Sequence, residues 1–121
     1  MYRALMMLAA ADALAFGLGS LLLPDVVLFV LGGETNDLGS ALLRELGAIL
    51  LALGLIAWFL RDLDQGPMRR GVTSGTLVGI ALTAVIVGIV TASGMFNVLG
   101  WAIVAIHVAL AAGLAWELLG R

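Results

Sequence analysis

The chain of 121 residues contains no cysteine, and only 12% of its residues are charged. The absence of cysteine excludes disulfides, thiol catalysis and thiolate metal sites. With a single histidine, His107, the chain cannot build a metal site from several histidines of its own. The net charge of −2 gives no electrostatic support to nucleic-acid binding. Because the sequence shows no nucleophile–base pair, phosphate loop or metal-ligand spacing, we expect a protein that is not an enzyme.

Apolar residues make up 63% of the chain, against about 45–50% in an average soluble domain. A small soluble fold cannot bury so much apolar surface, because much of its surface stays wet. The apolar residues gather in four runs of about 20 residues or more, the length that a helix needs to cross a bilayer. The sequence therefore predicts an all-α bundle of four transmembrane helices in one integral membrane domain, residues 1–121. The expected spans are about 4–23, 41–60, 72–92 and 98–119.

The connection after the first run, PDVVLFVLGGETNDLGS, holds an apolar segment that is too short to span a membrane. Pro24 is suited to the first position of a helix, and Gly32–Gly33 to its end. We predict a short helix here, lying in the outer interface or against the bundle. Candidates for the cap of the second span are Asn36, Asp37 and Ser40.

The arginines are distributed unevenly about the four expected spans. Only Arg44 falls toward one side of the membrane, and the other five fall on the side of both termini. These five are Arg3, Arg61, Arg69, Arg70 and Arg121. Basic residues concentrate on the cytoplasmic side of membrane proteins, so we expect a multi-pass protein with both termini in the cytoplasm.

Two ionisable residues, Asp12 and His107, lie near the middle of the first and fourth spans. An ionised carboxylate at that depth costs a few kcal/mol, so Asp12 must be protonated, paired or in contact with a wet cavity. The similar depths of the two residues predict an intramembrane polar pair that sets the helix register. Three alternatives remain open: a lone neutral histidine, a proton site, and an axial ligand to haem or chlorophyll at His107.

Small residues recur every four positions in several spans, most regularly at Gly71, Gly75, Gly79 and Thr83 of the third. Such faces let helix backbones approach closely in lipid. We expect this face to serve internal packing of the bundle or to dock a partner subunit.

The adjacent pair Arg44 and Glu45 opens the second span. Neighbouring residues on a helix point about 100° apart, so the two do not face each other. We expect an interfacial role for them, with a place in the wall of a cavity as the alternative.

Three stretches carry a family likeness: LLLPDVVLFVLGG after the first span, RELGAILLALGLIAWFLRD in the second, and GWAIVAIHVALAAGLAW in the fourth. In layout and in these stretches the chain resembles the small four-span bacterial membrane proteins grouped as DoxX-like. The resemblance implies a four-helix bundle in the bacterial inner (plasma) membrane, often an accessory part of a larger assembly. It transfers no catalytic residue to this chain.

Three functions remain open from the sequence. The first is a non-enzymatic accessory or scaffold subunit that packs against helices of other membrane proteins. The second is a small homo-oligomeric, proton-coupled transporter or channel that uses Asp12 and His107. Asp12 is similar in placement to the acidic residue of the small multidrug transporters, although the motif around their Glu is absent here. The third is a subunit that binds haem or chlorophyll through His107.

Overall fold

The computed structural model describes residues 1–120 and has five helices in that part of the chain. Four of them are long and apolar enough to cross a membrane, which makes the chain a multi-pass membrane protein. The expected all-α fold class, with four long helices and a short one in the first loop, is confirmed. The helices are α1 (Tyr2–Leu22), α2 (Pro24–Leu31), α3 (Asp37–Phe59), α4 (Pro67–Ala92) and α5 (Leu99–Leu119).

The helix ends follow local sequence signals more closely than they follow hydropathy. Helix α4 begins at Pro67, five residues before the expected span, because proline fits the first helical position after Gly66. Helix α3 begins at Asp37, and the side chain of Asn36 caps it by accepting a hydrogen bond of 2.8 Å from the amide of Gly39. The apolar runs mark the segments suited to lipid, and the helices continue beyond them.

Helix α2 has the two boundaries that the sequence predicts. Pro24 occupies its first turn, and Gly32 ends it in the left-handed conformation with φ of 80°. The hydroxyl of Ser40, a candidate cap for α3, instead donates to the carboxylate of Asp25 at the start of α2. This bond ties the short helix to the first turn of α3.

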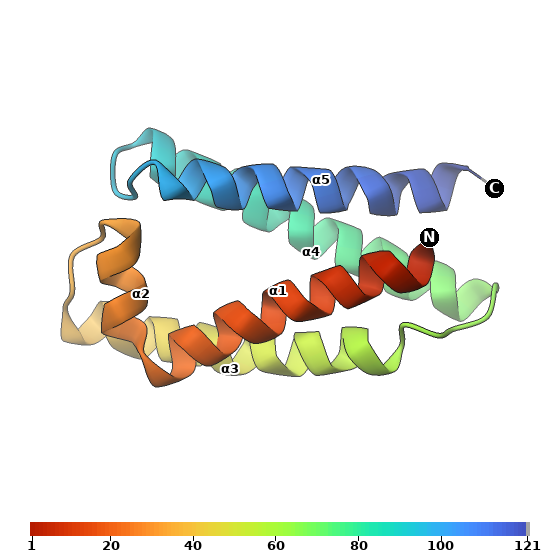
Figure 1. Cartoon of the computed structure of the whole chain (residues 1–121), viewed down its shortest axis with the longest axis horizontal. Coiled ribbons are helices and arrows are strands. Elements are labelled where there is room, and N and C mark those ends of the chain that lie inside the picture. The colour runs from red at the N-terminus through yellow and green to blue at the C-terminus, as the bar shows by residue number, and fades with distance from the viewer. Residues whose placement is uncertain (121) are drawn as a thin grey trace.

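The long helices form two antiparallel pairs, α1 with α3 and α4 with α5 (Figure 1). Glycines let the first pair approach closely, since a Cβ at Gly47 would lie 2.6 Å from the backbone nitrogen of Leu21. At Gly54, a Cβ would lie 2.8 Å from Cγ of Leu14. Contacts between the two pairs are fewer and are made mainly by α1 with α5, and α3 and α4 are not among the helices that pack extensively against each other.

The two pairs are joined at both ends of the molecule. At the end that holds the N-terminus, here called the Tyr2 end, residues of α1, α3 and α5 form the hydrophobic core (Figure 1). The fully or nearly buried members of this core are Tyr2, Met6, Ala10, Ala57 and Leu114.

At the opposite end, here called the α2 end, α2 crosses from the first pair toward the turn between α4 and α5 (Figure 1). Asn97 in that turn donates its amide N–H to the carbonyl of Leu31 at 2.7 Å. Its side-chain amide donates to the carbonyl of Val30 at 2.8 Å. The two pairs are therefore connected at both ends, and they separate toward the α2 end, where α2 bridges them (Figure 1).

Candidate functional site

Asp12 and His107 meet across the interface between α1 and α5. Each lies near the middle of its helix, and the His107 Nε2 atom is 3.3 Å from the Asp12 Oδ2 atom. The side chain of His107 is 10% exposed and that of Asp12 is 34% exposed. The imidazole is therefore enclosed, while the carboxylate borders the space between the two helix pairs.

The second nitrogen of His107 is held by its own helix. Nδ1 lies 2.8 Å from the carbonyl oxygen of Ile103, one turn earlier in α5. A carbonyl oxygen only accepts hydrogen bonds, so Nδ1 carries a hydrogen and donates it. The ring is thereby oriented with Nε2 toward α1.

Between the pairs lies a chamber with a volume of about 510 Å³, and Asp12 and His107 form part of its wall. The chamber reaches the surface between α3 and α4, since the lining residues Leu53 and Ile86 are 53% and 60% exposed. Its lining is otherwise apolar apart from two threonines, Thr76 and Thr83. Both threonine hydroxyls donate to carbonyls of their own helix, at 2.9 and 3.0 Å.

The small-residue face of α4, formed by Gly71, Gly75, Gly79 and Thr83, is turned away from internal helix contacts. A Cβ added at any of its three glycines would meet no atom within 4 Å. Gly75, Gly79 and Thr83 line the chamber instead. The glycines of α1 and α3 serve close packing within the chain, whereas this face of α4 does not.

Arg44 and Glu45 are not brought to the chamber. Both residues are exposed, and neither lines it. Arg44 precedes Gly47, which packs against Leu21 near the α2 end of α1, so it lies several turns from the level of Asp12.

The polar cluster at the Tyr2 end was not predicted from the sequence. Arg69 of α4 forms an ion pair with Glu117 of α5, and the two side chains are only 13% and 11% exposed. The Arg69 guanidinium also lies over the Tyr2 ring, 4.1 Å from its centroid, which links the two helix pairs. The signal in the sequence is that residues 69 and 117 lie near the facing ends of consecutive antiparallel helices.

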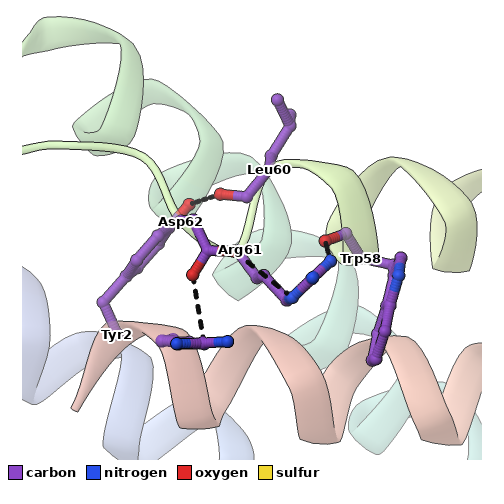
Figure 2. A network of polar contacts seen from close by, with 6 residues as sticks. Tyr2, Trp58, Leu60, Arg61 and Asp62 are labelled. Carbon is purple, nitrogen blue, oxygen red and sulfur yellow. Dashed lines mark hydrogen bonds and ion pairs between the residues drawn. The ribbon is translucent and has the colours of Figure 1, made fainter.

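A second set of contacts at this end closes the pair of α1 with α3 (Figure 2). The Tyr2 hydroxyl donates to the carbonyl of Leu60 at 2.8 Å, and Asp62 pairs with Arg3 at 3.0 Å. Arg61 lies 4.1 Å from the centroid of the Trp58 ring and 3.5 Å from Asp62. Arg121 lies outside the described residues.

Within residues 1–120, no group of three or more His, Cys, Asp or Glu residues is placed to hold a metal ion. The bond from Nδ1 of His107 to a carbonyl is one that histidine ligands commonly make. Asp12, however, occupies the position that a metal or haem iron at Nε2 would take. An axial-ligand role would require Asp12 to move away.

Comparison of the chain with protein-family models, with curated proteins and with solved structures gives no match.

Proposed function

We propose that this protein is a non-enzymatic membrane subunit, and that the mouth of its chamber between α3 and α4 receives a helix of a partner membrane protein. The observation that carries the proposal is the unused small-residue face of α4. Gly75 and Gly79 have open space where a Cβ would be, whereas Gly47 has backbone at 2.6 Å. Small residues let helices approach in lipid, so such a face fits a helix supplied from outside the chain.

The length of the chamber supports a helix as its occupant. Lining residues on α4 run from Val72 to Val90, which spans about 27 Å at 1.5 Å per residue. The hydrocarbon core of a bilayer is about 30 Å thick. A lipid acyl chain covers only one leaflet, whereas a transmembrane helix covers the whole depth. We therefore favour a helix over a single lipid chain.

The two alternative functions have less support. A proton-coupled transporter needs a polar path, and the chamber lining is apolar apart from Asp12, His107 and two threonines. A haem- or chlorophyll-binding subunit needs a free Nε2 atom on His107, and Asp12 lies 3.3 Å from it.

The proposal includes a location in the bacterial inner membrane with both termini in the cytoplasm. Arg3 and Arg61 contact Asp62, and Arg69, which Arg70 follows in the chain, lies over Tyr2. These arginines at the Tyr2 end support this orientation by the positive-inside rule. The DoxX-like resemblance of the sequence supports the accessory role and the bacterial source. The accessory role and the bacterial source are therefore part of the proposal.

The test is the mass of the particle extracted from native membranes, measured by native mass spectrometry for three forms of the chain. The unmodified chain is expected in a complex with a second, different polypeptide at fixed stoichiometry. Gly75→Leu fills the small-residue face at a position where an added Cβ meets no atom of the chain within 4 Å, so it should release that polypeptide. Ala109→Leu makes a similar enlargement on the exposed face of α5, outside the chamber, and should leave the complex intact.

Three results would contradict the proposal. The first is an unmodified chain whose particle contains no second polypeptide, because such a chain has no partner subunit. The second is a complex that survives Gly75→Leu, because such a complex does not use the small-residue face of α4. The third is a complex that is lost in the Ala109→Leu variant but kept in the Gly75→Leu variant, which would show that the partner binds to α5 and not to α4.

A further inference from the structure

The contact between Asp12 and His107 requires a proton. Nδ1 of His107 donates its hydrogen to the carbonyl of Ile103 at 2.8 Å, so the neutral imidazole presents a lone pair at Nε2. An ionised carboxylate also presents only lone pairs. The two atoms lie 3.3 Å apart, and two hydrogen-bond acceptors do not attract each other at that distance. The contact is therefore attractive only when the pair holds one further proton, on Nε2 or on the carboxyl oxygen.

Among residues 1–120, no other ionisable group lines the space around this pair. The residues that line the chamber from α1 to α5 include no titratable or charged side chain besides Asp12 and His107. The charged residues carried by the surrounding helices lie nearer to the helix ends. They include Arg3 on α1, Asp25 on α2, Arg44 and Glu45 on α3, Arg69 on α4 and Glu117 on α5.

With one shared proton the pair is neutral overall, whichever atom holds it. Without that proton, the chamber wall carries a net negative charge that no neighbouring cation balances. Burial of an unpaired charge in an apolar environment is strongly unfavourable. Loss of the proton therefore removes the attraction between the two side chains and favours entry of water or separation of the two helices.

The pair also links the two halves of the molecule. Asp12 belongs to the pair of α1 with α3, and His107 to the pair of α4 with α5. The other polar links between the halves lie at the ends: Arg69 over Tyr2, and the bonds of Asn97 to α2. Within residues 1–120, the polar link between the halves at mid-depth is Asp12 with His107.

We propose that Asp12 and His107 together form a binding site for one proton, and that this proton sets the spacing between the two helix pairs. The mouth of the chamber between α3 and α4 then widens when the proton is lost. This inference goes beyond the partner-subunit function and does not depend on which molecule occupies the chamber.

The test is a distance measurement by electron paramagnetic resonance between two nitroxide labels. The chain has no cysteine, so Ile49→Cys on α3 and Val85→Cys on α4 direct the labels to two known sites. Both positions are exposed and neither lines the chamber. In liposomes, the distance distribution is expected to be narrow and short at acidic pH, and longer or broader at alkaline pH.

Asp12→Asn supplies the decisive comparison. The asparagine amide donates a hydrogen to Nε2 without binding a proton, so this variant should keep the short distance at every pH. Thr76→Val alters another polar residue of the chamber and should retain the pH transition of the parent. The labelled parent, which retains Asp12 and His107, is measured first. Its response to pH tests the inference even if the Asp12→Asn variant does not fold.

A parent whose distances do not change between pH 4 and pH 10 would overturn the inference. So would an Asp12→Asn variant that follows the same pH transition as the parent. Either result leaves the partner-subunit proposal untouched, because that proposal is judged by the mass of the extracted complex.

Discussion

An imidazole in the middle of an apolar helix needs a hydrogen-bond partner for each ring nitrogen, because unpaired buried polar atoms are costly. His107 is hydrogen-bonded to the carbonyl of Ile103 on its own helix, and its Nε2 atom lies 3.3 Å from the carboxylate of Asp12 on α1. Each residue thereby gives the other a polar partner, and burial of either side chain without one would cost free energy. Sequence depth alone placed the two at similar levels, but the shared proton follows only from the orientation of the ring.

The same reasoning applies to charge at the Tyr2 end. Arg69 and Glu117 are 13% and 11% exposed, so each would be a nearly buried ion without the other. Arg69 also covers the ring of Tyr2, which is buried in the core. Loss of one member of a buried ion pair leaves the other charge uncompensated.

We expect Arg69→Met to lower the free energy of unfolding by about 3 kcal/mol, the order typical of a broken buried pair. The double variant Arg69→Met, Glu117→Leu should recover most of that loss, because no unpaired charge remains. Denaturant unfolding in a mild detergent, followed by circular dichroism, measures both values. Equal destabilisation in the single and double variants would show that the pair contributes through packing alone.

At the scale of the helices, glycines decide which elements lie close together. Gly47 of α3 faces the backbone of α1, with Leu21 N at 2.6 Å and Gly17 O at 2.7 Å from a Cβ added there. These atoms belong to main chain, so they cannot rotate out of the way. Gly75 of α4 faces open space.

Gly47→Ala should therefore separate α1 from α3 and destabilise the fold by about 1–3 kcal/mol, the usual cost of overpacking. Gly75→Ala should leave the stability unchanged or raise it by up to about 1 kcal/mol, through the better helix propensity of alanine. Thermal unfolding of the two purified variants in the same detergent makes the comparison. A similar loss in both would indicate that α4 packs internally through this face.

Much of the element structure could be predicted from the sequence. Pro24 and Gly32 bound α2 as expected, because proline and glycine act through local backbone geometry. Helix α4 begins at Pro67, before the expected span, since hydropathy reports the apolar stretch and not the first helical turn. The choice of Asn36 among three candidate caps needed the backbone conformation at that residue.

At the scale of the whole molecule, the sequence predicted four spans but not how they pair. Small-residue spacing is alike in α1, α4 and α5, so it could not reveal that Gly17 of α1 is tightly packed whereas Gly75 and Gly79 of α4 are not. Nor does the sequence show that α3 and α4 do not pack extensively against each other. The chamber is a product of that arrangement, and its lining combines residues from all five helices.

The whole arrangement is two helix pairs held at both ends around an apolar chamber. The hydrophobic core and Arg69 join the pairs at the Tyr2 end, and Asn97 joins them at the α2 end. The central claim is that the mouth of this chamber receives a helix from a different membrane protein.

Site-specific photo-crosslinking in native membranes tests that claim most directly. A benzophenone side chain at position 83 replaces Thr83 in the chamber wall, and one at position 85 replaces Val85, which is 58% exposed and outside the chamber. We predict a discrete adduct with one other protein from position 83 and none from position 85. Gly75→Leu should abolish that adduct. Lipid adducts only, an adduct of two copies of this chain, or equal protein adducts from both positions would contradict the account.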